Sequence, residues 1–500
     1  MDIELFSVSL LNVLHWKPLL MIFLGVTGGI IIGSLPGLTA TMGVALLVPF
    51  TFGLPLIESI GMLLGIFCGA IYGGSIPAIL IRTPGTPAAA ATLIDGYPLS
   101  QKGEAGRALS ISVFSSFVGG LSGALIMAVL SPQISKFALQ FGSAEYFALA
   151  VFGLSIIVSV SSGSIIKGII VGFLGLLIST IGMDPITGYP RFTYGSIDLF
   201  EGPAFIPTLI GLFAFSEVFK GVETLSSTTK TAKRIKSVFP LFSDIKIVWK
   251  GIAKSSVLGT FIGAIPGAGS DIAAFVGYSE AKRQSKNPEK FGKGAIEGVA
   301  AAESANNACT GGAMIPMLSL GIPGDAVTAI LLGAFVIQGF QPGPMMYQDH
   351  LDVVYTVFSS MMVANIALLI VGLIGIRLFA RTITVRKSIL LPAIFVLSIV
   401  GAYSMRNSMF DIWVALFFGV LGYFLQRYRF PVSPILLALI LGPMAESNLR
   451  RAFIIADDSM ISVLTRPITA TLLTLGIIAL VTAVFRQRKL DKNLAIIDDS

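Results

Sequence analysis

Apolar runs of roughly 20 residues, the length that a helix needs to cross a bilayer, recur along almost the whole chain. They predict crossings near residues 108–131, 145–162, 165–182, 204–219, 353–378, 388–404, 411–425, 431–446 and 467–485. Residues 1–15 instead mix Asp2 and Glu4 with Leu and Phe, which is typical of an amphipathic helix at the membrane interface. The pattern predicts an all-α polytopic membrane protein with about 10–12 transmembrane segments.

Two of the apolar stretches are interrupted in the same way. The segments Gly33–Thr41 (GSLPGLTAT) and Gly263–Asp271 (GAIPGAGSD) each place Pro-Gly inside an apolar run and follow it with small and hydroxyl-bearing residues. Unpaired backbone is costly inside a membrane unless it lines a protein-enclosed cavity. Broken helices at matching positions of two halves are therefore a strong indication of a transporter's substrate site.

A second pair of blocks extends this internal repeat. The block Ile76–Thr86 aligns with Ile315–Asp325 at an offset of 239 residues, which places Arg82-Thr83-Pro84-Gly85-Thr86 against Gly321-Ile322-Pro323-Gly324-Asp325. We therefore expect each half to contain both a Pro-Gly hairpin and a broken helix.

Basic residues place the second Pro-Gly segment on a re-entrant hairpin. The clusters Lys220–Lys254 and Lys282–Lys293 are both expected in the cytoplasm, where loops of membrane proteins collect Lys and Arg. Between them, 255–265 and 270–280 are each too short to cross alone. The alternative is one continuous kinked crossing, which would place one basic cluster outside. The odd number of crossings between the two hairpins predicts that the second repeat is inverted relative to the first.

The same scheme assigns the loops to the two sides of the membrane. The weakly charged loops 183–203, 347–352, 402–410 and 446–466 are predicted to face outside, an assignment that Lys136, Arg450 and Arg451 oppose. The predicted first repeat covers 1–220, with a hairpin at 18–52 and a broken helix at 57–98. A cytoplasmic basic linker follows at 221–250. The second repeat covers 251–485, with a hairpin at 251–281 and a broken helix at 294–342, and 486–500 forms a cytoplasmic tail.

Composition narrows the class of protein. Hydrophobic residues make up 54% of the chain and charged residues 12%, against roughly a quarter charged in soluble proteins. The sequence offers no continuous basic face, so we expect no nucleic-acid partner. It contains neither a phosphate-binding Gly-x-x-x-x-Gly-Lys-Ser/Thr loop nor a His-Glu-x-x-His helix, and we expect no enzymatic activity. Cys68 and Cys309 imply neither a disulfide framework nor a metal cluster.

The Pro-Gly blocks also predict where a substrate binds. Helix N-termini after Pro-Gly present free N–H groups and a positive dipole end, so two facing ends can hold a carboxylate. Arg82 would add a bidentate contact, or would instead reach the interface or pair with an acid such as Asp95. The predicted substrate-binding residues are Pro36, Gly37, Leu38, Thr39, Arg82, Thr83, Gly85, Thr86, Pro266, Gly267, Ala268, Gly269, Ser270, Asn306, Pro323 and Gly324.

Oxygen-bearing side chains in the same stretches suit a hard cation such as Na⁺. The predicted Na⁺ ligands are Thr39, Thr41, Ser270, Asp271, Asn306, Asn307, Thr310 and Asp325. The alternative is that the hydroxyl groups only cap the half-helices. Any charged ligand is expected in the second repeat, because it has Asp271 and Asp325 where the first has Thr41 and Thr86. Glu303 is a further buried carboxylate, which would carry a proton, bind a cation or pair with Lys293. No cofactor is expected other than the coupling ion.

Together these motifs resemble a known family. The segments Gly33–Thr41, Tyr72–Gly85, Gly263–Asp271, Glu297–Thr310 and Pro316–Asp325 are similar to the large, TctA-type membrane subunit of tripartite tricarboxylate transporters. The resemblance covers essentially the whole chain. It implies a multi-pass subunit of the bacterial inner membrane and secondary active transport that imports carboxylates such as citrate. The implied partners are a separate small four-helix membrane subunit and a periplasmic substrate-binding protein.

The sequence leaves several points open within this interpretation. It does not choose among tricarboxylates, dicarboxylates and aromatic acids, or between elevator-like and rocking movements. The scarcity of histidine and the hydroxyl-rich Pro-Gly tips favour sodium symport over H⁺ coupling. An anion channel or an uncoupled carboxylate permease is the alternative function. A homo-oligomer is compatible with the sequence.

Overall fold

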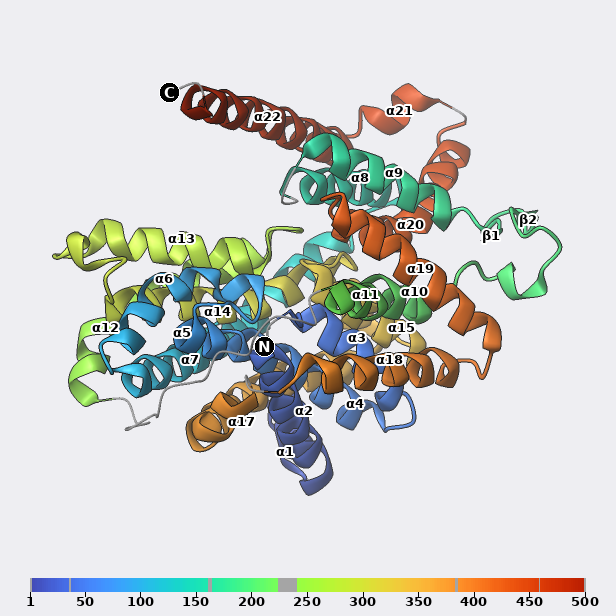
Figure 1. Ribbon diagram of the computed structural model, residues 1–500. Helices are drawn as coiled ribbons and strands as arrows, with labels where there is room; N and C mark the ends of the chain where they lie inside the picture. The colour runs from blue at the N-terminus through green and yellow to red at the C-terminus, as the bar shows by residue number, and fades with distance from the viewer. Residues whose placement is uncertain are drawn as a thin grey trace.

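The computed structural model describes residues 2–35, 37–160, 164–223, 241–382, 385–457 and 459–498. Over these residues the chain is almost entirely helical (Figure 1). The exception is a hairpin of two-residue strands, β1 (Gly182–Met183) and β2 (Pro190–Arg191), in the loop between α9 and α10. The predicted all-α class is confirmed.

The first half of the chain runs from α1 to α11. Its helices are α1 (Ile3–Leu14), α2 (Trp16–Ser34), α3 (Ala40–Thr51), α4 (Leu56–Gly73), α5 (Ser75–Ile81), η1 (Pro87–Ala89), α6 (Ala90–Gln101), α7 (Ala105–Ala138), α8 (Ser143–Val160), α9 (Ile165–Ser179), η2 (Ile197–Leu199), α10 (Phe205–Leu209), the π-helical η3 (Ile210–Phe215) and α11 (Ser216–Glu223).

The second half begins after residue 240. Its helices are α12 (Phe242–Gly263), α13 (Gly269–Gln284), η4 (Pro288–Lys290), α14 (Ile296–Leu320), α15 (Ala326–Ile337), α16 (Met346–Asp349), α17 (Leu351–Thr382), α18 (Lys387–Ser404), α19 (Met409–Arg427), α20 (Ser433–Ile455), α21 (Met460–Leu464) and α22 (Pro467–Asp498).

Eight helical stretches among the described residues are long and apolar enough to cross a membrane. They are Trp16–Ser34, Leu56–Ile81, Ala105–Ala138, Phe205–Glu223, Leu351–Arg381, Lys387–Ser404, Met409–Arg427 and Pro467–Phe485. The sequence predicted about 10–12 segments. The difference arises because α8 and α9 offer shorter apolar stretches, while α20 and α14 carry polar residues. The chain is a multi-pass membrane protein.

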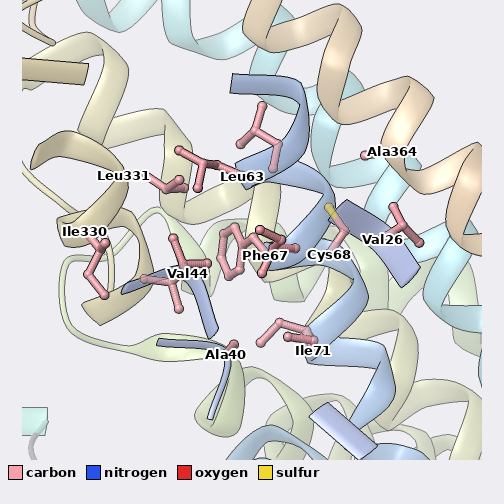
Figure 2. Close-up of a cluster of buried hydrophobic side chains, with 14 of the residues drawn as sticks. Val26, Ala40, Val44, Leu63, Phe67, Cys68, Ile71, Ile330, Leu331 and Ala364 are labelled. Carbon is pink, nitrogen blue, oxygen red and sulfur yellow. The ribbon is translucent and has the colours of Figure 1, made fainter. Parts of the chain in front are cut away.

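The two halves of the chain are interleaved in space. Helix α7 of the first half packs along α14 of the second half, and α17 of the second half packs along α2 and α4 of the first. Figure 1 shows α12, α13 and α14 beside α5, α6 and α7. A buried hydrophobic cluster joins α2, α4, α7, α14 and α17, and Figure 2 shows Val44 of α3 between Phe67 of α4 and Ile330 of α15 in this cluster. A site at this junction is therefore built from both halves.

Close backbone contacts repeat between the two halves. A Cβ atom on Gly33 would lie 2.2 Å from the Ala70 carbonyl oxygen, and one on Gly263 would lie 2.5 Å from that of Cys309. One turn earlier, Gly29 meets Ile66 in the same way that Gly259 meets Ala305. These pairs occupy equivalent positions in the two sequence blocks, so the repeat extends to the packing. The inverted orientation of the two copies remains a prediction.

The linker predicted at 221–250 falls mostly on residues that the structure does not describe. Residues 224–240, which carry most of its predicted basic cluster, lie outside the described residues, and α12 already begins at Phe242. Asp244 lies in its first turn, where a carboxylate stabilises a helix. Asp244 is buried and accepts hydrogen bonds from the Arg107 guanidinium of α7 at 2.6 and 2.8 Å. Helix α12 therefore begins before the predicted hairpin at 251–281 and extends beyond its apolar stretch 255–265, and the added turns carry Lys246, Lys250 and Lys254.

The glycine contacts generate a prediction about stability. Replacing Gly259 by Ala should lower the thermal stability of the purified protein by about 1–3 kcal/mol or more, because the new methyl group would lie 2.1 Å from the Ala305 carbonyl oxygen. Gly251 on the same helix has nothing within 4 Å of its added Cβ. Gly251→Ala is the control and should leave the melting temperature unchanged or raise it, because Ala favours a helix. Equal melting temperatures for the two variants would contradict the close packing.

Candidate functional site

A cavity of about 220 Å³ lies where the broken segments of both halves meet. The turns before α3, α13 and α15 and the segment leading into η1 supply most of its wall, and α4 and α20 complete it. Its lining residues are Thr39, Ala40, Thr41, Ile71, Thr86, Pro87, Ala88, Gly267, Ala268, Gly269, Ser270, Asp271, Ile272, Asp325, Ala326, Val327, Ser433 and Leu437. Ala40 and Ile71 also belong to the hydrophobic cluster in Figure 2, which therefore lies against this wall.

Three helices begin at this cavity. The first residues of α3, α13 and α15 all line it, so three positive dipole ends meet there. Thr39 caps α3 by accepting a hydrogen bond from the Met42 amide at 3.1 Å. Asp325 caps α15 through its Oδ1, which accepts from the Thr328 amide at 2.8 Å. Among the described residues no side chain caps α13 from its N-cap position, Ala268. Asp271 lies in its first turn instead, and a Cβ atom on Gly269 would lie 2.7 Å from the Asp271 Oδ1, so this carboxylate sits at the helix N-terminus.

Two carboxylates share the cavity without a cationic side chain. Asp271 and Asp325 both line it and are close enough for their charges to interact. None of the described residues that line it is Lys, Arg or His. Two like charges in a desolvated site repel each other, and intramembrane carboxylates normally have a partner. The site therefore suits a bound cation or protons.

Two buried hydroxyl groups of the cavity wall lack partners. Thr86 is 3% exposed and Ser270 is 6% exposed, and neither hydroxyl has a hydrogen-bond partner among the described residues. An unpaired buried polar group costs about 1–3 kcal/mol. A ligand in the cavity that forms hydrogen bonds with these two hydroxyl groups would remove this cost. Thr86 and Ser270 come from different halves of the chain.

The turns around the cavity are held by backbone hydrogen bonds. The amide of Gly267 donates to the carbonyl of Gly324 at 2.7 Å, which joins the turn before α13 to the turn before α15. Gly267 has a φ of 85°, a left-handed conformation that favours glycine. This contact fixes Asp271 and Asp325 relative to each other.

The structure brings about half of the predicted site residues to the cavity. Those that line it are Thr39, Thr41, Thr86, Gly267, Ala268, Gly269, Ser270, Asp271 and Asp325. Those that do not are Gly37, Leu38, Arg82, Thr83, Gly85, Pro266, Asn306, Asn307, Thr310, Pro323 and Gly324. Pro36 lies outside the described residues. The glycines and prolines in the second set shape the turns, and Gly85 packs against the backbone of Gly33 and Gly74.

Arg82 does not pair with Asp95, one of the alternatives that the sequence left open. It ends α5 in a left-handed conformation, is exposed, and places its guanidinium 5.8 Å from the centre of the Tyr97 ring. Asp95 accepts instead from the amides of Gly292, Gly294 and Ala295 at 2.7–2.8 Å. The cavity therefore has no arginine from α5.

Asn306, Asn307 and Thr310 belong to a polar network inside α14. Its centre is Glu303, which is fully buried and accepts hydrogen bonds from Thr92 of α6 and, at 2.9 Å, from Ser116 of α7. Asn307 donates to Ser116 at 2.9 Å. These two hydroxyl donors, rather than the expected Lys293, are the described partners of the Glu303 carboxylate. The network reaches the cavity wall only through Asn306, whose amide lies 3.4 Å from the Ala88 carbonyl.

Sequence reasoning missed the contribution of α20. Ser433 and Leu437 line the cavity from a helix more than a hundred residues beyond the second repeat block. Neither belongs to a Pro-Gly block, and only the packing of α20 against α15 brings them there. No local signal in the sequence distinguishes them from the other residues of this apolar stretch.

Broken helices that enclose a small acid-lined cavity in a multi-pass protein define a membrane transport protein. The family comparison agrees, because residues 19–437 match the tripartite tricarboxylate transporter TctA family. The chain belongs to this family and is a large membrane subunit of a tripartite tricarboxylate transporter.

Two relatives come from Agrobacterium vitis. The chain is 40% identical over 461 residues to the "Uncharacterized 52.8 kDa protein in TAR-I ttuC' 3'region", and the aligned region covers 92% of each chain. It is 39% identical over 241 residues to the "Uncharacterized protein in TAR-II ttuC' 3'region", which covers 48% of this chain and 100% of that protein. No solved structure matches the chain.

The Glu303 network generates a second prediction. Glu303→Ala should destabilise the purified protein by about 1–3 kcal/mol beyond Glu303→Gln, because alanine leaves the buried hydroxyls of Thr92 and Ser116 without an acceptor. Glutamine keeps an acceptor oxygen of similar reach. Melting temperatures in detergent test the difference, and equal values for the two variants would show that the hydroxyls find other partners.

Proposed function

We propose that this subunit carries a small organic carboxylate across the membrane through the central cavity, coupled to the movement of a cation. The observation that supports this most directly is the pairing of three helix N-termini with two aspartates in one cavity of about 220 Å³. The helix N-termini suit an anion, and the aspartates suit a cation.

Electrostatics makes the two ligands depend on each other. A carboxylate entering the cavity would meet the negative charges of Asp271 and Asp325 with no Lys, Arg or His among the lining residues to offset them. A cation held by the aspartates removes this repulsion and adds attraction, which is strong in a low-dielectric site. Each ligand thus raises the affinity for the other, as coupled transport requires.

The oxygen ligands favour Na⁺ over a proton in this proposal. Besides the two aspartates, the cavity presents the hydroxyl oxygens of Thr39, Thr41 and Ser270. A hard cation uses several such oxygens, whereas a proton needs one. Thr39 and Asp325 also cap helices through hydrogen bonds, and this does not prevent their remaining lone pairs from binding an ion.

Cavity size supports a small acid as the substrate. Pockets for drug-sized ligands enclose roughly 300–1,000 Å³, so this one suits a compact di- or tricarboxylate. We further propose that a periplasmic binding protein delivers the acid, that a small membrane subunit completes the complex, and that the complex imports its substrate across the bacterial inner membrane. Membership of a tripartite family supports these partners.

Substitution of the aspartates tests the proposal. Asp271→Asn and Asp325→Asn should each lower the apparent Na⁺ affinity for carboxylate uptake by about tenfold or more, because each removes a charge from a desolvated site. Asn caps a helix about as well as Asp, so Asp325→Asn should leave α15 intact. The measurement is Na⁺-dependent uptake of labelled citrate, succinate and benzoate by cells that express the subunit with its tripartite partners.

Glu280→Gln is the matched control. Glu280 lies on α13 with Asp271 but pairs with Arg283 at 2.7 Å, outside the cavity. The Glu280→Gln variant should therefore transport carboxylate normally. Unchanged Na⁺ dependence in both aspartate variants would refute cation binding in the cavity. Uptake that responds to pH instead would assign the site to protons, and flux that never saturates would favour an anion channel.

A further inference from the structure

A second and larger cavity of about 800 Å³ lies along the later turns of α20. Its wall combines this helix with the segment after α15 and with the turn between α14 and α15. Polar groups of Gln341, Ser447, Asn448 and Arg451 reach it, beside Tyr146 and Met345. Its lining residues Pro185 and Ser447 belong to 183–203 and 446–466, two of the segments that the sequence predicts to face outside.

Arg451 brings a positive charge to this cavity that its neighbours do not neutralise. Arg450 binds Asp184 at 2.5 Å, and Arg191 binds Glu446 at 2.6 Å. The Thr187 amide and the Arg450 guanidinium hold the pKa of Asp184 well below its usual range, so that carboxylate is charged and already engaged. Among the described residues no acidic side chain forms an ion pair with Arg451, which is exposed. Its guanidinium is available to a free carboxylate.

One face of α20 connects this cavity to the central one. Ser433 and Leu437 line the central cavity, and Ile440, Met444, Ser447 and Arg451 line the larger one. Steps of three and four residues place these side chains along one helical stripe. The α14–α15 turn follows the same course, with Gly321 in the larger cavity and Asp325 in the central one.

We propose that the larger cavity is an outer vestibule in which Arg451 captures the carboxylate substrate before it moves along α20 to the central cavity. This inference rests on the proposed carboxylate transport. It also gives a role to Arg451, one of the basic residues that opposed the predicted topology. Transfer from the vestibule requires a cation in the central cavity, because that cavity offers the incoming acid two aspartates and no arginine.

Cysteine labelling tests the vestibule without requiring transport. Asn448→Cys places a thiol one turn before Arg451, while the native Cys68 and Cys309 are buried. In intact cells, the positive charge of Arg451 should raise the rate at which this thiol reacts with an anionic methanethiosulfonate relative to a cationic one. Adding Arg451→Gln should lower the anionic-to-cationic rate ratio on the order of threefold to tenfold, through loss of one nearby charge. Citrate or succinate should slow the anionic reaction only when Arg451 is present.

Lys136→Gln provides the matched control. Lys136 is exposed, was predicted on the same side of the membrane and does not line the cavity, so its loss should leave the rate ratio unchanged. An equal fall with Lys136→Gln would show a general surface effect and overturn the proposal. Reaction of Asn448→Cys only in inverted vesicles, or no protection by citrate, succinate or benzoate, would also overturn it.

Uptake measurements separate this inference from the proposed function. In cells with the whole tripartite system, Arg451→Gln should raise KM about fivefold to tenfold with little change in kcat, and Arg451→Lys should recover part of the loss. If the unmodified protein transports carboxylate and Arg451→Gln does not change KM, the vestibule inference fails alone. If no carboxylate is transported, the proposed function fails, whatever the labelling shows.

Discussion

The structure depends on the need to satisfy backbone hydrogen bonds where helices break inside a membrane. Lipid offers no partners for free N–H and C=O groups, so broken segments must find them within the protein. Here the broken segments pair with one another: Gly267 donates to Gly324 at 2.7 Å, and Gly85 donates to Gly74 at 3.0 Å. These bonds require close backbone approach, which Gly33, Gly259 and Gly263 provide by packing directly on a facing helix. The small residues of the repeat are thus explained by packing before any ligand is considered.

The same constraint places chemistry at the cavity. Once the turns are locked together, the helices that follow them must start at the junction, and α3, α13 and α15 direct their N-termini there. The side chains just after each turn, including Thr41, Ser270 and Asp271, are carried to the cavity by the same geometry. A cavity that combines helix N-termini with two carboxylates is therefore a consequence of breaking helices in both halves and joining the breaks at one place.

Sequence reasoning succeeded where local pattern controls structure. Hydrophobic runs located most helices, and the Pro-Gly blocks located the breaks, because both signals act over a few residues. It failed where position depends on tertiary packing. Asn306 and Asn307 are predicted ligands, yet neither lines the cavity: Asn307 donates to Ser116, and Asn306 reaches the cavity wall only through the Ala88 carbonyl. Arg82 follows a predicted break, but the left-handed end of α5 directs it to Tyr97. The contribution of Ser433 from α20 has no local signal at all.

The difference between the two repeats gives a nearly symmetric framework an asymmetric cavity. Equivalent glycines make equivalent contacts in both halves, so the framework alone would offer two similar surfaces. At the cavity, however, the first half supplies Thr86 where the second half supplies Asp325 at the matching position. The first half contributes neutral hydroxyls and a helix N-terminus, whereas the second contributes both negative charges. Under the proposed function, the second half would therefore hold the cation, and the charge of that cation would make the junction with the first half favourable for an anion.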